Sequence, residues 1–488
     1  MPTLDTPREK TIALVLLAMT QFLIVVDASI VNVALPTIGR DLEFSQDNLS
    51  WVINAYTLFF GGFLLLGGRL ADLLGRRRMF IGGLVLFSLA SLAGGFATSD
   101  VVLIVARAFQ GLGAAIIAPA ALSIITTNWE EGSERNKALG VWGAVAGAGG
   151  AAGVLLGGIL TEGLGWEWVL WVNVPIGLAV AFLAPRILPE SRDEVEDRSF
   201  DIPGAVMVTV GLALLVYFIV DAESAGWSSF QTLAGIALAL AFIATFLFIE
   251  TKARKPLMPL STFRLQTLRG ANVVGLLVGM SLFSMFFLIS LYLQQVLGFS
   301  ALEAGLAYLP LSVVIILAAG IASQLVTRLG FKPVLITGML LVASGLLWFT
   351  RISVDGSFAA DMLGPSLLAA AGLGFSFVPV TIAAVTGTRP DQAGLASGLI
   401  NTSQQVGGAL GVAILASIAS SVSGGINPQG RLAPEQLEKL TEGFQAAFAV
   451  GAGFAILGAI TAALLISSKD SKEMAEAAQA GEPVVAAA

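Results

Sequence analysis

Long apolar segments, separated by short polar connections, occupy most of this 488-residue chain. Fourteen of them are long enough to cross about 30 Å of hydrocarbon, which takes about 20 helical residues. Because a spanning segment must satisfy its own backbone hydrogen bonds, each is expected to be a helix, so the pattern predicts an all-α polytopic membrane protein. The segments run approximately over residues 11–36, 48–74, 79–97, 100–127, 137–160, 167–185, 201–220, 230–250, 268–297, 302–326, 333–350, 358–386, 393–420 and 444–467.

Composition supports a membrane protein and narrows its chemistry. Charged residues make up 12% of the chain, against about 25% in soluble domains. The chain has no Cys and no His, so it lacks thiolate and imidazole metal ligands and the usual proton carrier near neutral pH. A net charge of −7 argues against a nucleic-acid partner. Proton chemistry is therefore expected to use carboxylates, and no metal site is expected.

The orientation of the spans follows from Lys and Arg, which are enriched in cytoplasmic loops. With the N-terminus inside, two of the 26 Lys and Arg residues fall within spans, and most of the others lie in inner loops or tails. Both termini are therefore predicted to be cytoplasmic. The four that fall in outer loops are Arg40, Arg351, Arg431 and Lys439.

The chain repeats itself weakly at an interval of eight spans. Residues 68–77 follow the second span, residues 324–332 follow the tenth, and the two segments share Leu, Gly and basic positions. This interval predicts two six-helix bundles with two extra central helices, as in transporters with a site between related halves. The predicted units are an N-terminal bundle (1–186), a linker with two additional transmembrane helices (187–262), a C-terminal bundle (263–470) and a disordered tail (471–488).

One carboxylate lies deep in the first apolar segment. An ionised Asp27 at the middle of a spanning helix costs about 2.5–3.5 kcal/mol on insertion scales. One interpretation is a structural Asp that is hydrogen-bonded to a neighbouring helix. We favour the other, a site that takes up and releases a proton, because ionisable residues inside membranes usually have a function.

Arg107 is expected at a similar depth. Asp27 lies nine residues before Pro36 at the outer end of the first span, about 13 Å at 1.5 Å per residue. Arg107 lies seven residues after Asp100 at the outer end of the fourth span, about 10 Å. The two side chains can therefore form a pair or a water-bridged contact that couples protons to transport. The alternative is a static buried ion pair.

The inner connection after the second span combines glycines, a carboxylate and arginines. Glycines permit close helix contact, and a carboxylate at this place can cap a neighbouring helix or pair with Arg. Such contacts can hold the two bundles in one state and release them in the other. The alternative is a solvated charged loop. The candidate latch residues are Gly68, Asp72, Gly75, Arg76 and Arg77.

Four segments carry a family resemblance. Residues 27–36, 68–77, 107–113 and 168–177 resemble signature motifs of the major facilitator superfamily, and specifically of its fourteen-span drug:proton antiporter family. The resemblance covers nearly the whole chain. It departs at Leu73, where the family usually has Arg. It implies the major facilitator fold and multidrug efflux driven by protons.

The fifth span resembles the antiporter signature of the same family. That signature normally has Pro where this chain has Val154, so an expected kink is missing. The glycine-rich face still permits tight packing against a neighbour. A gating role and a simple packing role are both open. The candidate residues are Gly149, Gly153, Gly157 and Gly158.

Other polar side chains within spans are candidates for lining a substrate cavity. An apolar cavity with scattered amides suits bulky amphipathic compounds better than sugars or phosphates. Each residue is individually a weak signal, since polar side chains in spans also serve helix packing. The candidates are Asn54, Tyr56, Gln110, Tyr292, Gln294, Asn401 and Gln404.

Together these observations predict a secondary active exporter in a bacterial cytoplasmic membrane. The sequence has no phosphate-binding loop for ATP, so we expect neither an enzyme nor a cofactor, with the proton gradient as energy source. The expected partners are lipophilic, cationic drugs, protons and lipid, and we expect a monomer. The alternatives are a dedicated exporter of one metabolite or antibiotic, an uptake carrier of the same fold, and a non-transporting membrane sensor or scaffold.

Overall fold

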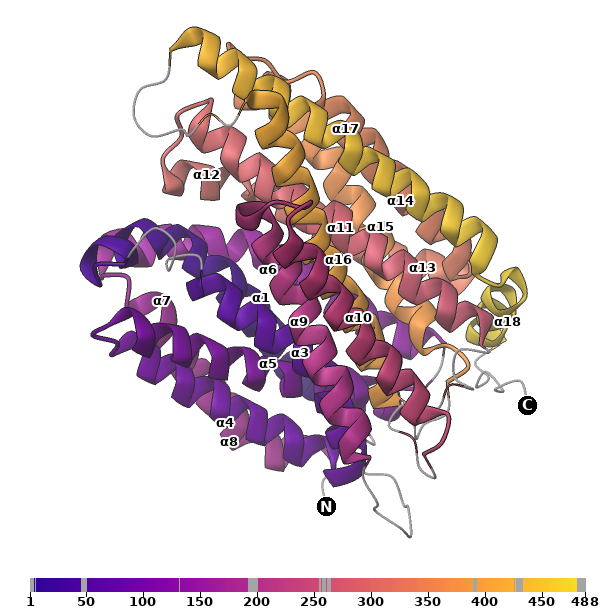
Figure 1. Cartoon of the computed structure of the whole chain (residues 1–488). Coiled ribbons are helices and arrows are strands. Elements are labelled where there is room, and N and C mark those ends of the chain that lie inside the picture. Colours follow the sequence, from indigo (N-terminus) through magenta and orange to yellow (C-terminus); the bar gives the residue numbers. More distant parts are fainter. Residues whose placement is uncertain are drawn as a thin grey trace.

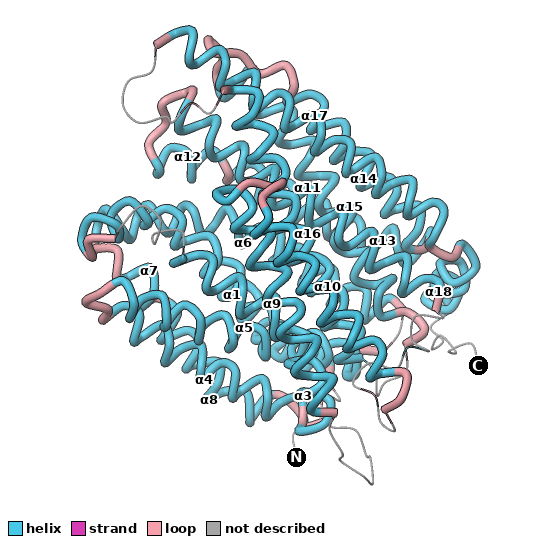
Figure 2. The backbone as a smooth tube through the Cα atoms, in the orientation of Figure 1, coloured by secondary structure: helices cyan, strands magenta, loops and turns pink. Residues whose placement is uncertain are grey.

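The computed structural model describes residues 4, 6–44, 51–130, 132–191, 201–253, 256, 260, 265–388, 393–424, 426 and 433–480. Within these ranges the regular secondary structure is entirely helical, as Figure 2 shows. The first half contains α1 (Pro7–Asp41), α3 (Trp51–Leu74), α4 (Arg76–Gly95), α5 (Asp100–Asn128), α6 (Ser133–Gly163), α7 (Trp168–Trp171), α8 (Asn173–Ile187), α9 (Ile202–Ala225) and α10 (Phe230–Glu250). The second half contains α11 (Gln266–Gln295), α12 (Ala301–Ala307), α13 (Leu309–Leu329), α14 (Phe331–Phe349), the short π-helix η2 (Phe358–Met362), α15 (Leu363–Val385), α16 (Ala393–Ser423), α17 (Pro434–Leu465) and α18 (Ser468–Ala480).

Twelve helical segments in the described ranges are long and apolar enough to cross a membrane. Three of them join consecutive elements, α7 with α8, α12 with α13, and η2 with α15. The helices α6 and α9 contain shorter apolar segments, Ala152–Gly163 and Pro203–Ile219. The chain is therefore a multi-pass membrane protein.

The spans form two bundles (Figure 1). The indigo-to-purple helices α1 and α3–α8 pack on one another, with α3 and α4 against α5 and with α1 against α6. The later helices α11–α17 form the second bundle, in which α11 packs on α16 and α17 while α15 packs on α13 and α14. The two seams between the bundles are made by α6 against α13 and by α3 against α16.

The helices α9 and α10 pair with each other and lie over the seam between α3 and α16 (Figure 1). On one side Tyr217 of α9 stacks on Trp51 of α3, with ring centroids 5.5 Å apart. On the other side Trp227, after α9, donates its indole N–H to Ser417 Oγ of α16 at 2.8 Å. Of the two additional helices predicted in the linker, α9 therefore contacts both bundles, and α10 packs on α9.

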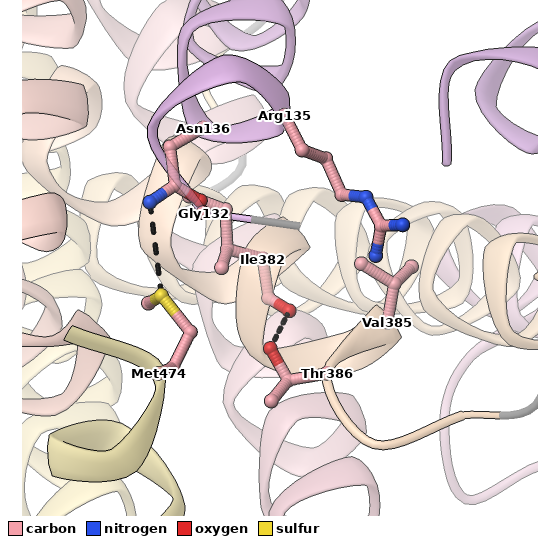
Figure 3. Close-up of a pocket in the computed structure, with 7 residues that line it drawn as sticks. All are labelled: Gly132, Arg135, Asn136, Ile382, Val385, Thr386 and Met474. Carbon is pink, nitrogen blue, oxygen red and sulfur yellow. Dashed lines mark hydrogen bonds between the residues drawn. The ribbon is translucent and has the colours of Figure 1, made fainter. Parts of the chain in front are cut away.

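The first turn of α6 connects both ends of the chain. Lys10 of α1 forms an ion pair with Glu134 at 2.8 Å. Asn136 Nδ2 donates a hydrogen bond to Met474 Sδ of α18 at 3.7 Å. Asn136 also faces the second bundle, because its backbone carbonyl accepts from Ser323 Oγ at 2.7 Å. Figure 3 shows the small pocket at this junction, between α6, the end of α15 and α18. The start of α1 and the helix α18 thus lie at the same end of the molecule.

The tail differs from the disordered segment predicted for residues 471–488, since residues 468–480 form α18. Ala is the strongest helix former, and this segment is rich in it. Met474, Ala475 and Ala478 are buried, and Ser471 Oγ accepts from the backbone N–H of Lys332 at 3.0 Å. The segment is therefore helical because one apolar face of α18 packs against the rest of the protein. Residues 481–488 lie outside the described residues.

Close packing of α11 on α16 gives a test of the fold. A Cβ at Gly407 would lie 2.8 Å from the carbonyl carbon of Leu276, whereas a Cβ at Gly453 meets nothing within 4 Å. We predict that Gly407→Ala lowers the free energy of unfolding by about 1–3 kcal/mol, because the backbones must separate. The matched variant Gly453→Ala should be neutral. Thermal unfolding of both in detergent checks this, and equal melting temperatures would contradict the packing.

Candidate functional site

Asp27 and Arg107 form a buried ion pair in the first bundle. Arg107 Nη1 of α5 donates to Asp27 Oδ2 of α1 at 2.7 Å, and the two side chains are 1% and 0% exposed. The two residues predicted to lie at a similar depth are therefore in direct contact. Removing two charges from water is costly, and such a pair persists only with good geometry and further hydrogen bonds.

Those further hydrogen bonds to Asp27 come from α8 and from a second residue of α5, which α4 supports in turn. Asp27 Oδ1 accepts from Asn173 Nδ2 of α8 at 2.7 Å and from Gln110 Nε2 of α5 at 3.0 Å. Gln110 Nε2 also donates to Ser91 Oγ of α4. Both carboxylate oxygens therefore have donors, which compensates for the loss of water.

The guanidinium of Arg107 also has partners besides Asp27. Its Nε donates to the backbone carbonyl of Val52 at 3.0 Å, and its Nη1 donates also to Gln110 Oε1 at 3.0 Å. The ring of Tyr56 lies 4.4 Å from Arg107 Cζ, a distance at which the π-face attracts a cation. Tyr56 and Gln110, which were predicted to line the cavity, are thus members of the Asp27 cluster.

Asn173 and Ser91 were not predicted for this cluster. Asn173 is fully buried and is the first residue of α8, inside the segment 168–177 that carries one of the family motifs. A buried amide in an apolar segment is a usable signal, and it was overlooked. Ser91 gave no signal, because a serine in a glycine-rich span is usually satisfied by its own helix.

The predicted glycines of the fifth span pack α6 on α1 next to Asp27. A Cβ at Gly149 would lie 2.9 Å from Val25 Cβ, and one at Gly157 would lie 2.7 Å from the carbonyl oxygen of Ile30. A Cβ at Gly153 would collide with Ser29 Oγ. Only residues without a side chain permit this approach. Gly158 faces the other way, towards Leu302 of α12, at 3.4 Å from its Cα.

The inner connection between α3 and α4 is well ordered by charge pairs. Arg76 Nη2 donates to the buried Asp72 Oδ1 at 2.9 Å, and Ser123 Oγ of α5 donates to the same oxygen at 3.5 Å. The chain turns at Gly75 with φ of +111°, in the region that favours glycine. Arg77 donates to the carbonyl of Leu188 at 2.9 Å, at the end of α8.

The preceding helix α3 also lies close to the second bundle. A Cβ at Gly398 of α16 would lie 3.3 Å from the carbonyl oxygen of Leu64, two turns before Asp72. Gly68 is buried in the same part of α3. Asp72 and Arg76 are buried, which excludes the alternative of a solvated loop for these two residues.

The remaining predicted cavity residues do not form one cluster. Tyr292 is fully buried, and its hydroxyl donates to the carbonyl of Ser353 at 2.7 Å, so it fastens α11 to the loop after α14 rather than lining a cavity. Gln294 is exposed. Asn54 and Asn401 are half-buried and Gln404 is buried, on the seam helices α3 and α16. No group of three or more acidic side chains suited to a metal occurs in the described ranges.

The buried pair at the inner connection gives a second test. Asp72→Ala leaves the guanidinium of Arg76 buried without this carboxylate, so we predict a loss of about 3–5 kcal/mol of stability. Lys439→Ala removes an exposed pair with Glu435 at 3.3 Å and should cost less than about 1 kcal/mol. Chemical unfolding in detergent compares them, and a similar small effect of both changes would show that Asp72 contributes little.

Comparison with known proteins places the chain in a family. The sequence matches the Major Facilitator Superfamily over residues 17–412. It is 41% identical over 418 residues to the cephamycin export protein CmcT of Amycolatopsis lactamdurans, covering 85% of this chain and 86% of the relative. It is 38% identical over 460 residues to the puromycin resistance protein pur8 of Streptomyces alboniger, covering 93% and 91%.

A third relative and a solved structure agree with this. The tetracenomycin C resistance and export protein of Streptomyces glaucescens is 34% identical over 417 residues, covering 85% of this chain and 77% of the relative. The structure of the human organic anion transporter MFSD10 superposes with a TM-score of 0.68 at 17% identity, covering 94% of this chain and all of that one. The last likeness concerns the fold alone. With its two helical bundles, its motifs and these relatives, the chain belongs to the major facilitator superfamily.

Proposed function

We propose that this chain is a proton-coupled exporter of lipophilic, cationic drugs, an antiporter that releases drug as protons enter. The observation that carries the proposal is the buried cluster around Asp27, where a carboxylate in a membrane span has a complete set of hydrogen-bond donors. Efflux as such is supported by relatives that are named for the export of, or resistance to, antibiotics. The source of energy is the proton gradient, and no cofactor is proposed.

In this mechanism Asp27 carries the proton. Protonation removes the negative charge that faces Arg107, and the guanidinium then keeps only neutral acceptors, Gln110 Oε1 and the carbonyl of Val52. The attraction between α1 and α5 weakens, because an ion pair in a low dielectric becomes an ion and a neutral acid. Proton uptake therefore changes which arrangement of the first bundle is the most stable.

We propose that α6 transmits this change to the second bundle. Its glycines contact α1 on both sides of Asp27, and Gly158 contacts α12. Because helices at this distance cannot slide independently, a shift of α1 moves α6 against α12 and α13. In the same scheme the inner latch of Gly68, Asp72, Gly75, Arg76 and Arg77 holds the inner ends of the bundles together in one state.

The topology proposed for this exporter has fourteen spans and cytoplasmic termini. The two spans beyond the twelve long apolar segments are α6 and α9, which have 31 and 24 residues. An even number of spans brings both termini to one side, which fits the common contacts of α1 and α18 with the first turn of α6. The distribution of Lys and Arg makes that side the cytoplasm. We propose a monomer in the bacterial cytoplasmic membrane, with lipid as its surroundings.

A second candidate function is the export of one antibiotic. It is favoured by relatives that are named for single compounds, cephamycin, puromycin and tetracenomycin C. The number of chemically unrelated dyes and drugs that the purified protein moves in proteoliposomes separates the two candidates. Transport of one scaffold alone would support the dedicated exporter.

The role of Asp27 is tested by efflux against an imposed pH gradient. We predict that Asp27→Asn abolishes pH-driven efflux while the protein remains folded and inserted, because an amide cannot release a proton but retains the size of the side chain. The control Asp100→Asn changes a half-exposed acid at the start of the Arg107 helix and should leave efflux unchanged. Wild-type efflux by Asp27→Asn would refute the proposal.

A further inference from the structure

Asn173 makes the shortest contact that any amide makes with Asp27. Its Nδ2 lies 2.7 Å from Asp27 Oδ1, and its side chain is fully buried at the first residue of α8. A carboxylate only accepts hydrogen bonds, so the amide must turn its nitrogen towards an ionised Asp27. This orientation is the one that the structure has.

The other end of the same amide is unusual. Among the residues that the structure describes, the buried Oδ1 of Asn173 has no hydrogen-bond partner. A buried carbonyl oxygen without a partner costs about 1–3 kcal/mol, so such atoms are rare. The consequence is that a half-turn of the amide about its Cβ–Cγ bond breaks no hydrogen bond at the far end.

A protonated Asp27 needs an acceptor, and the cluster limits where it can be. The acid hydrogen cannot point from Oδ2 to Arg107, because a guanidinium has donors only. On the side of Oδ1 there are two amides. The Oε1 of Gln110 already accepts from Arg107 Nη1 at 3.0 Å, whereas the Oδ1 of Asn173 is uncommitted.

We propose that Asn173 is a positioning residue that follows the protonation of Asp27 by turning its amide, donating through Nδ2 to the carboxylate and accepting through Oδ1 from the protonated acid. The inference rests on the proposed proton exchange at Asp27. The proton moves onto Asp27 Oδ1 and stays there. No other bond forms or breaks apart from the exchanged hydrogen bonds.

The other groups around the Asp27 carboxyl leave the role of hydrogen-bond acceptor for the protonated acid to Asn173. The charged and titratable groups facing Asp27 in the described ranges are Arg107 from α5 and Tyr56 from α3. The Tyr56 hydroxyl donates to the carbonyl of Ile24 at 3.4 Å. From α4, Ser91 Oγ accepts from Gln110, and α6 presents glycines to α1 at this level. The rotation of the Asn173 amide therefore makes α8, which begins at Asn173, the helix that responds to protonation of Asp27.

Infrared difference spectroscopy of the full chain in lipid, recorded between acidic and alkaline pH, tests the proposal. The carboxylic acid carbonyl band of Asp27 is identified by its loss in Asp27→Asn. In Asn173→Leu, which keeps the volume but has no acceptor, we expect this band to move to higher wavenumber, because the acid loses its hydrogen-bond acceptor. The matched control Asn272→Leu changes a buried amide of α11, in the other bundle, and should leave the band in place.

A measurement on the unmodified chain covers the case in which Asn173→Leu does not fold. With asparagine labelled by carbon-13 in the side-chain amide, the amide carbonyl band should change with pH in wild type and not in Asp27→Asn. An unmoved acid band in folded Asn173→Leu, or a pH-independent amide band in wild type, overturns the role of Asn173. Absence of any titrating band that depends on Asp27 overturns proton exchange itself, so the two failures are distinguishable.

Discussion

The first bundle depends on holding two opposite charges in a place without bulk water. An ionised carboxylate or guanidinium there is tolerated only when the partner charge and enough dipoles surround it. The chain meets this requirement by bringing five segments together: α1 with Asp27, α5 with Arg107, α8 with Asn173, α4 through Ser91 and α3 through the carbonyl of Val52. The positions of these helices relative to one another are therefore tied to one cluster. Any change of charge inside it is a change of the forces between all of them.

Glycine residues determine how far a displacement caused by such a change of charge is transmitted. At Gly153 and Gly157 the backbone of α6 lies against backbone carbonyls of α1, those of Val26 and Ile30, so little flexible side chain lies between the two helices to absorb a displacement. Gly158, the residue directly after Gly157, contacts the second bundle at Leu302. A helix with one face on the charged span and the other on the opposite bundle is a rigid connection between the site and the seam. Packed interfaces of this kind favour discrete arrangements over gradual deformation.

Much of this architecture could be predicted from the sequence because the bilayer imposes strong rules. Apolar length located the helices, and the rise per residue was enough to match Asp27 with Arg107. Rotation about each helix axis was not accessible in the same way. Asn173 and Ser91 were not predicted, because packing decides which face of α8 meets α1 and which face of α4 meets α5. Tyr292 was misplaced because its hydroxyl satisfies the carbonyl of Ser353, in a loop 61 residues away in the chain. The tail became helical because α18 finds an apolar surface on helices that are distant in sequence.

The hairpin of α9 and α10 covers the line where α3 meets α16, and its outer face carries apolar side chains such as Leu233, Leu240 and Phe248. A hydrophobic molecule dissolved in the surrounding leaflet meets those side chains before it can reach α3 or α16. Sideways approach from the lipid is therefore obstructed on this flank. On the opposite flank α6 packs directly on α12 and α13.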